Sequence, residues 1–179
     1  MRPLFCAVLA AAVLSAGIAA AEPAAYADLQ GATLEADWIE DMTSRPVNAP
    51  NFRTFRSPRQ LTLTFGPGDA IKHQIVRTTG ERSRTENRQM QLDKTQPSGI
   101  GVVHWAFENG KLIYVETMFS GARRLIVDIS KKDGALSCVI SAAIAREDNK
   151  PVVTLGLDNV TKVEIKEVQA AGGRCAISR

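Results

Sequence analysis

The stretch that decides the fold covers residues 101–119 and has the sequence GVVHWAFENGKLIYVETMF. Its centre is Asn109-Gly110, which is flanked on both sides by runs rich in β-branched and aromatic residues. A type I′ turn needs positive φ at both central residues, and Asn-Gly is the pair that adopts this conformation most readily. The stretch therefore predicts a β-hairpin with strands over Gly101–Glu108 and Lys111–Phe119.

The same alternating pattern recurs on both sides of this hairpin, and no convincing helical period is present from Gly31 onward. Turn signals such as Gly66-Pro67-Gly68-Asp69 and Lys131-Lys132-Asp133-Gly134 separate the segments. The further predicted strands are Thr33–Met42, Gln60–Phe65, Ile71–Thr78, Met90–Lys94, Arg123–Ser130, Ala135–Ala145, Val152–Leu155 and Thr161–Val168. In the last of these Val168 is out of phase, which indicates a bulge.

Two segments do not alternate and are predicted as connections. Residues Thr43–Pro58 contain three prolines and are expected to form a long link after the first strand. Residues Gly80–Arg88 are polar throughout and are expected to form an exposed loop.

This order predicts an all-β fold, an antiparallel meander of eight to ten strands. Sequential hairpins must protect their edge strands, and a closed up-and-down barrel of the lipocalin-like kind does so completely. A two-sheet β-sandwich is the alternative.

The first 21 of the 179 residues differ from the rest, since 17 of them are hydrophobic and Arg2 is their only charge. A positive start, an apolar stretch and Ala19-Ala20-Ala21 before Glu22 are typical of a cleaved secretory signal peptide. An uncleaved membrane anchor is the alternative. We therefore expect a signal peptide over residues 1–21, an irregular lead-in over 22–30 and a single all-β domain over 31–179. The mature protein is then exported, either periplasmic or secreted, and does not span the membrane.

Cleavage would remove Cys6 and leave two cysteines, Cys138 and Cys175. An even number of cysteines in an exported chain predicts one disulfide bond between them. Two separate buried thiols are the alternative.

Charge is distributed unevenly along the mature chain. Residues 22–50 carry a net charge of −5 and residues 51–94 a net charge of +5. We expect a basic rim at Arg77, Arg82, Arg84 and Arg88, suited to an anionic ligand, a lipid headgroup or an acidic protein partner. Solvated loops balanced by the acidic first strand are the alternative. The formal net charge of the whole chain, +3, is too small to indicate a nucleic-acid partner.

The sequence contains no motif that names a reaction. It has two histidines, His73 and His104, and His104 shares a strand face with Glu108. An acid–base pair is conceivable there, but an outward polar face is the simpler interpretation. We expect no metal, no cofactor and no catalytic residues, so the sequence weighs against an enzyme.

The hairpin around Asn109 is also the best candidate for a ligand wall, because Lys111–Phe119 is apolar on both faces. We expect Trp38, Trp105 and Tyr114 to line a small apolar or amphipathic ligand inside a barrel. Plain core packing is the simpler alternative for these side chains. A protein-interaction module, such as an exported inhibitor or envelope component using the basic Gly80–Arg88 surface, is the alternative function. The oligomeric state is not predicted.

Two resemblances point the same way. Leu29-Gln30-Gly31 followed by Trp38, with a meander and a late cysteine pair, resembles lipocalin-like (calycin) barrels, although Gly31 and Trp38 lie further apart than in the usual Gly-x-Trp motif. A second combination resembles small exported bacterial proteins of unassigned function: Trp38-Ile-Glu, Gly121-Ala-Arg-Arg, Ser137-Cys138, Val163-Glu-Ile and Cys175. These resemblances imply a location and a fold, and no catalytic residues.

Overall fold

The computed structural model describes residues 20–146, 150–156, 158 and 160–179, and every long element in it is a strand. The predicted signal peptide lies largely outside these residues. The elements are β1 (Glu22–Pro23), the 3-10 turn η1 (Tyr26–Leu29), β2 (Thr33–Pro46), β3 (Arg53–Phe65), β4 (Ala70–Thr79), β5 (Arg82–Gln91), β6 (Gln96–Pro97), β7 (Val102–Glu108), β8 (Lys111–Met118), β9 (Gly121–Lys132), β10 (Ala135–Ala145), β11 (Val152–Leu155) and β12 (Lys162–Ser178). Within this part of the chain no helix is both long and apolar enough to cross a membrane.

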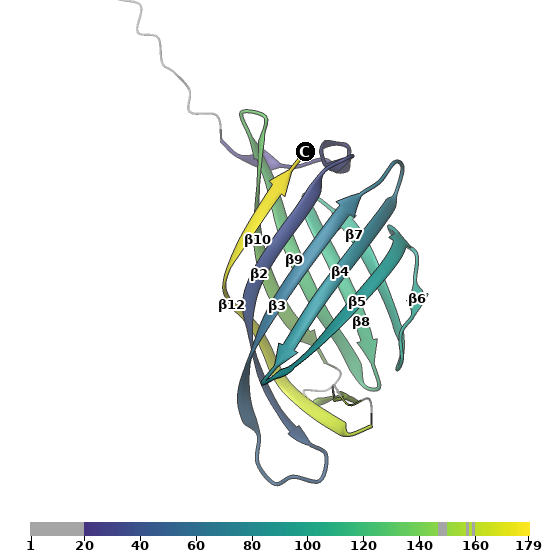
Figure 1. Cartoon of the computed structure of the whole chain (residues 1–179), viewed down its shortest axis with the longest axis vertical. Helices are drawn as coiled ribbons and strands as arrows, with labels where there is room; N and C mark the ends of the chain where they lie inside the picture. Colours follow the sequence, from purple (N-terminus) through teal and green to yellow (C-terminus); the bar gives the residue numbers. More distant parts are fainter. Residues whose placement is uncertain (1–19, 147–149, 157, 159) are drawn as a thin grey trace, which may run out of the picture.

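The strands form two antiparallel sheets that face each other (Figure 1). One sheet has the order β11-β12-β2-β3-β4-β5. The other has the order β6-β7-β8-β9, with both β1 and β10 paired to β9. The hairpin around Asn109-Gly110 joins β7 to β8, with φ values of 49° and 75° at the two turn residues, so the predicted turn is confirmed.

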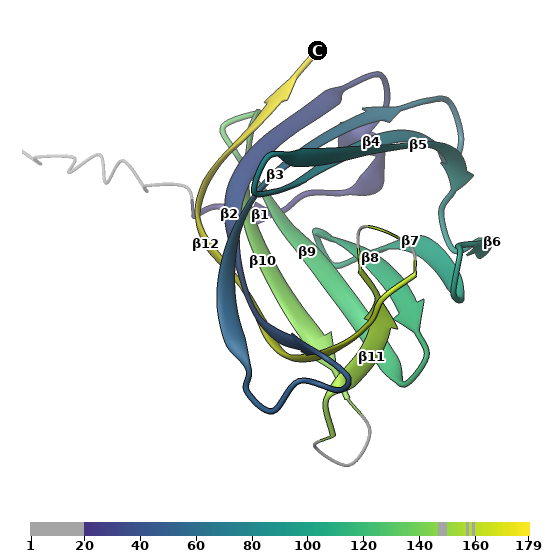
Figure 2. The same cartoon turned by 60° about the horizontal axis from the view of Figure 1, so that its bottom comes forward.

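The two sheets meet along one side, where β10 lies beside β12 and the Cys138–Cys175 disulfide joins them across a Cα–Cα distance of 5.6 Å. The predicted disulfide is therefore present in the structure. On the other side the edges of β5 and β7 face each other, and no ladder joins them among the described residues; we call this the β5–β7 seam (Figure 2). The antiparallel all-β meander is confirmed, the sheet curls without closing, and the choice between barrel and sandwich stays a prediction.

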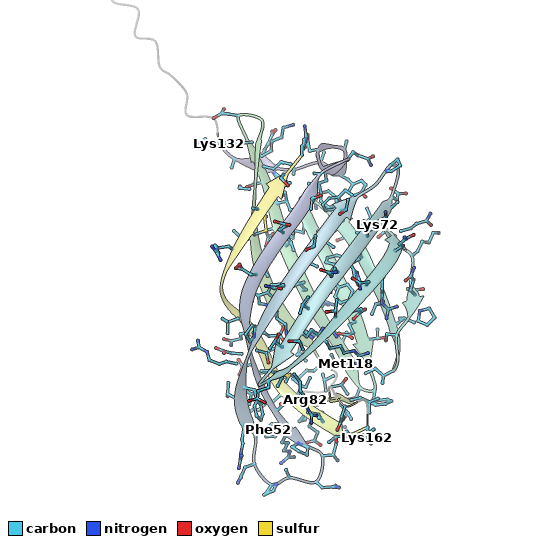
Figure 3. The ribbon with its side chains drawn as sticks, in the orientation of Figure 1. Phe52, Lys72, Arg82, Met118, Lys132 and Lys162 are labelled. Atoms are coloured by element: carbon cyan, nitrogen blue, oxygen red, sulfur yellow. A yellow bond between two sulfur atoms is a disulfide. The ribbon has the colours of Figure 1, made fainter. Side chains whose placement is uncertain are left out.

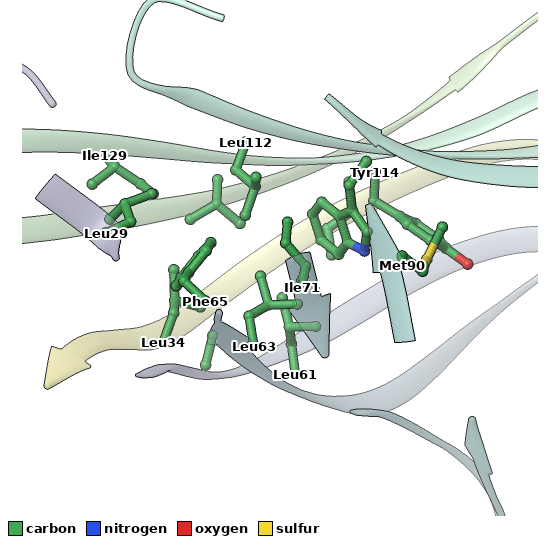
Figure 4. Packing of buried hydrophobic residues seen from close by; sticks show 14 of the residues in the cluster. Leu29, Leu34, Leu61, Leu63, Phe65, Ile71, Met90, Leu112, Tyr114 and Ile129 are labelled. Carbon is green, nitrogen blue, oxygen red and sulfur yellow. The ribbon is translucent and has the colours of Figure 1, made fainter. Parts of the chain in front are cut away.

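Apolar side chains from alternate positions of both sheets fill the space between them. Leu63 and Phe65 of β3 face Leu112 of β8, and all three are almost completely buried. Figure 4 shows this packing, with Leu29 of η1 at one end beside Ile129. Because the alternation of period 2 places successive side chains on opposite faces, the predicted inward residues of β2, Leu34, Ala36 and Trp38, are buried.

Two predictions about connections are wrong. The expected long link over Thr43–Pro58 is largely strand, because β2 runs to Pro46 and β3 begins at Arg53. Pro58 is tolerated in β3 because the ladder to β4 begins one residue later, at Arg59, so Pro58 has a strand on one side only.

The expected loop over Gly80–Arg88 is also strand from Arg82 onward, with only the tight turn at Gly80 and Glu81 outside β4 and β5. β5 lacks apolar alternation because it is an edge strand whose outer face meets solvent and whose inner face carries charge. The bulge expected near Val168 is confirmed by a register shift between Ile165 and Glu167, but β12 continues to Ser178.

The disulfide closes a loop with a sequence separation of 37 residues and joins two sheet edges. Replacing both cysteines by Ser should lower the free energy of unfolding by about 4 kcal/mol, because the unfolded chain regains the entropy of that loop. Urea unfolding of the variant and of the oxidised and reduced wild type would measure this. An unfolding midpoint that is unchanged by reductant would contradict it.

Gly110 and Gly134 offer a matched pair, since both have positive φ, 75° and 80°. A Cβ at Gly110 would lie 2.7 Å from the Ile129 carbonyl oxygen and 2.9 Å from Pro23 Cβ, whereas a Cβ at Gly134 would meet nothing within 4 Å. Gly110→Ala should therefore lower the free energy of unfolding by roughly 1–3 kcal/mol more than Gly134→Ala. Equal losses in urea unfolding would show that φ alone, and not this close approach, decides the cost.

Candidate functional site

One half of the space between the sheets is charged. In Figure 3 this half lies toward Arg82 and Met118, away from Lys72 and Lys132. Eight side chains from both sheets form what we call the inner charge cluster: Glu40 (β2), Arg59 (β3), His73 and Arg77 (β4), Glu86 and Arg88 (β5), Glu116 (β8) and Arg123 (β9). Each lies on the inner phase of its strand; Arg59, for example, continues the series Leu61 and Leu63.

Glu40 is the centre of the cluster and its side chain has no exposed surface. Its Oε1 accepts a hydrogen bond from Arg59 Nη2 at 3.1 Å, and its Oε2 accepts one from Arg123 Nη2 of the other sheet. Burial alone would raise the pKa of Glu40, but the charges of Arg123 and Arg59 and their hydrogen bonds outweigh it and hold that pKa below its ordinary value. Glu40 is therefore ionised at neutral pH and ties the two sheets together.

A second set of ion pairs surrounds Arg77. Its Nη2 lies 3.2 Å from Glu116 Oε2 of the facing sheet and 3.5 Å from Glu86 Oε2 on the neighbouring strand. Glu86 also accepts a hydrogen bond of 2.5 Å from Arg88 Nε. Burial raises the pKa of Glu86, but the His73 ring and the guanidinium groups of Arg77 and Arg88 more than compensate and lower it to about 2.

Aromatic side chains adjoin the cluster directly. The Trp105 indole N–H donates a hydrogen bond of 2.9 Å to His73 Nδ1, so the neutral His73 ring carries its proton on Nε2. The rings of Trp105 and Tyr114 lie 4.9 Å apart between centroids, and the ring of His73 lies 5.7 Å from that of Tyr114. In Figure 4 the phenol oxygen of Tyr114 lies at the end of the core away from Leu29 and Ile129.

Several donors in and beside the cluster lack a hydrogen-bond partner among the described residues. They are Arg59 Nε and Nη1, Arg77 Nε, His73 Nε2, the indole nitrogen of Trp38 and the hydroxyl of Tyr114. Arg59 lies directly opposite Arg77 in the β3–β4 ladder, and Arg77 lies opposite Arg84 in the β4–β5 ladder. Like charges opposite each other in a sheet repel, so this row depends on the carboxylates around it.

The chemistry that this arrangement favours is electrostatic binding and not proton transfer. Glu40 and Glu86 have lowered pKa values and stay ionised, while burial raises the pKa of the Tyr114 phenol, which stays neutral. None of these groups is therefore poised to exchange a proton near neutral pH. Guanidinium groups, a phenol and an indole N–H can all donate hydrogen bonds to an anion.

The structure brings two of the three expected ligand-lining residues into contact and places all three in the core. Trp105 and Tyr114 stack across the β7–β8 ladder, and Trp38 lies in β2 directly opposite Arg59. Their exposed fractions are 0%, 2% and 4% respectively.

The four arginines expected at a basic rim are divided between two environments. Arg77 and Arg88 belong to the inner charge cluster, and Arg88 Nη1 also donates a hydrogen bond to the Pro97 carbonyl across the β5–β7 seam. Arg82 and Arg84 are exposed at the start of β5.

The histidine–glutamate pair considered from the sequence does not form a joint site. His104 is half-buried and faces Val115, while Glu108 is exposed and faces Lys111 at the end of the same strand. Residues four apart along a strand are separated by about 13 Å. Among the described residues, no group of three His, Cys, Asp or Glu side chains is placed to hold a metal ion.

Two surface hollows lie outside the space between the sheets. One is on the outer face of β3, β4 and β5, lined by Thr62, Thr64, Lys72, Gln74, Asn87 and Gln89, together with His73 and Arg88 of the inner charge cluster. The other lies between β1 and the outer side of β9 and β10, near Pro23, Gly110 and Val139. Neither hollow contains the aromatic side chains expected to line a ligand.

Sequence reasoning missed six members of the cluster as site residues: Glu40, Arg59, His73, Glu86, Glu116 and Arg123. The sequence signal that could have found them is their position in the inward-facing alternation of each strand. Glu40 continues the inward series of Trp38, and Arg123 continues that of Leu125. A charged residue at the inner phase of several strands indicates a buried ion network.

Acid should weaken the fold through these carboxylates. The folded-state pKa of Glu86 is lowered from 4.5 to about 2, so its stabilisation is complete above pH 4.5 and is lost as the pH falls toward 2. Between pH 7 and pH 3 this group alone should remove on the order of 2 kcal/mol from the free energy of unfolding. Urea unfolding at several pH values should show a flatter dependence for Glu86→Gln than for the wild type. Glu35→Gln, on the exposed outer face of β2, is the control and should follow the wild-type curve; equal slopes for all three proteins would contradict the prediction.

No protein-family model matches this chain, and no curated protein or solved structure matches it either. The resemblances to lipocalin-like barrels and to small exported bacterial proteins therefore stay predictions. The function has to be inferred from the inner charge cluster and the aromatic side chains beside it.

Proposed function

We propose that this chain is an exported β-barrel protein that binds a small amphipathic ligand between its two sheets. The apolar part of the ligand lies against Trp105 and Tyr114, and its polar end meets the inner charge cluster. The observation that carries the proposal is the direct contact of these two environments, since His73 of the cluster accepts a hydrogen bond from Trp105. Binding sites for small molecules are mostly apolar, with a few polar groups placed to orient the ligand.

The cluster supplies the route to solvent. The side chains of Arg77, Glu116 and Arg88 are 13%, 14% and 23% exposed, in contrast to the fully buried aromatic rings. The β5–β7 seam lies beside them and is bridged by isolated hydrogen bonds. Gln96 Nε2 of β6 donates to the Gln89 carbonyl, Arg88 Nη1 donates to the Pro97 carbonyl of β6, and the Asp93 backbone N–H donates to the Trp105 carbonyl of β7. Isolated hydrogen bonds open more easily than a ladder, so this seam is the proposed entrance.

A barrel and an exported location fit the remaining observations. The disulfide between β10 and β12 joins the sheets at one side, and disulfides persist in oxidising compartments. The leader over residues 1–21 has the composition of a secretory signal peptide. Closure at the β5–β7 seam when ligand is bound would complete the barrel.

The alternative is a protein-interaction module that uses the basic surface of Arg82, Arg84 and Arg88. It has less support, because Arg88 already pairs with Glu86 and Pro97 and points into the molecule. Arg82 and Arg84 alone leave a small basic area.

Ligand binding is tested by thermal unfolding and by tryptophan fluorescence in the presence of dodecanol, dodecanoate, dodecyl phosphate and dodecyltrimethylammonium, each below its micelle concentration. At a ligand concentration of 100 Kd, binding should stabilise the fold by about 2.7 kcal/mol and raise Tm by roughly 5–10 °C. Binding should also change the emission of Trp105, which lies in the proposed site. If no compound changes either Tm or fluorescence, the proposal is wrong.

Tyr114→Phe keeps the ring and removes a hydroxyl that has no partner among the described residues. We expect the variant to fold as stably as the wild type and to bind the preferred amphiphile roughly 5- to 10-fold more weakly, because one hydrogen bond to its polar end is lost. Val139→Ser, on the exposed outer face of β10, should bind like the wild type. Identical affinities for the Tyr114 variant would place the ligand elsewhere.

A further inference from the structure

We propose that Arg59 and Arg77 form an oxyanion subsite, in which Arg59 Nε and Nη1 and Arg77 Nε bind a carboxylate or phosphate group. The inference rests on the proposed function, because the group belongs to the amphipathic ligand whose apolar part lies against Trp105 and Tyr114. It names the class of that ligand: an amphiphile with an anionic oxygen head.

The first support is the hydrogen bonding of Arg59. Its side chain is 4% exposed, yet only Nη2 has a partner, Glu40 Oε1. Arg123 binds the other oxygen of Glu40, so Arg59 pairs with only one of the two oxygens of this carboxylate. Its remaining donors, Nε and Nη1, have no partner among the described residues. A buried donor without a partner is costly, and guanidinium donors in a plane match the two oxygens of a carboxylate or phosphate.

The second support is the position of Arg77. It lies directly opposite Arg59 in the β3–β4 ladder, on the same inner face, and its Nε also lacks a partner in the described part of the chain. Its Nη2 is occupied by Glu116 and Glu86, so the side chain is held in place while Nε remains available. Two guanidinium groups on adjacent strands thus have three donor nitrogens without a partner among the described residues.

The third support is charge. The cluster contains four guanidinium groups, Arg59, Arg77, Arg88 and Arg123, and three carboxylates, Glu40, Glu86 and Glu116. One monoanion would balance the charges of these seven side chains. Burial, together with the charges of Arg123 and Arg77, lowers the pKa of Arg59 although Glu40 raises it. A second anion beside Arg59 would relieve this repulsion.

Buried water is the other partner that unpaired donors accept, and it would satisfy the hydrogen bonds without balancing the charge. The two cases differ in what they predict for ligands with the same tail. An oxyanion subsite discriminates between head groups, whereas donors satisfied by water do not. Inorganic phosphate and acetate, which have no tail, separate a free-anion site from an amphiphile site.

The experiment measures the affinity of the full mature protein for dodecanoate, dodecyl phosphate, dodecanol, acetate and inorganic phosphate by titration calorimetry. We expect dodecanoate or dodecyl phosphate to bind about 10- to 100-fold more tightly than dodecanol, the range for charge-assisted hydrogen bonds. Arg59→Met should abolish this preference, so that dodecanoate and dodecanol bind the variant with similar affinity. Arg82→Met, at an exposed position outside the cluster, is the control and should keep the wild-type preference.

Arg59→Met is chosen because we expect this variant to fold. Arg59→Met replaces a buried cation by an apolar side chain of similar length, and Glu40 keeps its partner Arg123. Should the variant nevertheless unfold, the Nε–H resonances of Arg59 and Arg77 in the wild-type protein provide the second measurement. They should shift with dodecanoate and stay unchanged with dodecanol.

The outcomes separate the two proposals. Equal affinity of wild type for dodecanoate and dodecanol overturns the subsite and leaves the binding function standing, with water as the partner of these donors. Binding of acetate or phosphate with no binding of any amphiphile supports the subsite as a free-anion site and overturns the amphiphile function. Absence of binding by all five compounds overturns both.

Discussion

The carboxylate of Glu40 is buried between the guanidinium group of Arg59, in its own sheet, and that of Arg123, in the facing sheet. The charged half of the space between the sheets depends on this contact. A carboxylate without exposed surface is stable only while its charge is paired. Strands β2, β3 and β9 are therefore held in one register, because a shift of a single residue would move Arg59 or Arg123 to the outer face. Arg77 and Glu116 repeat the link between the sheets from β4 to β8.

The same constraint explains why the space between the sheets has two different halves. Toward η1 the sheets are joined by apolar packing, which is not directional and tolerates small adjustments. Toward Arg82 they are joined by ion pairs, which require defined positions. Trp105 and Tyr114 lie at the boundary and contact both halves through His73. At this boundary an apolar wall and a polar wall adjoin, which is the arrangement on which the proposed binding of an amphipathic molecule rests.

The fold was predictable where the pattern was regular, and the failures have physical causes. Asn109-Gly110 predicted its hairpin because only a few dipeptides accept positive φ twice. β5 was missed because an edge strand with an exposed outer face and a charged inner face shows no apolar alternation. Arg77 was expected at a rim, and its inward position follows from its phase with His73 and Ile75. A charged residue on the inner phase looks solvated until its partners on distant strands are known.

Stability alone does not account for the inner charge cluster. Replacing a buried ion network by apolar side chains of similar volume is often neutral or stabilising, so the network contributes little that Leu and Val would not. It does fix register, because each charged side chain must meet its partner on another strand. The cluster also has one guanidinium group more than it has carboxylates, and three of the donor nitrogens without a partner among the described residues lie on Arg59 and Arg77, which face each other across one ladder. Register accounts for the paired groups, and the proposed anionic ligand would account for the additional guanidinium group.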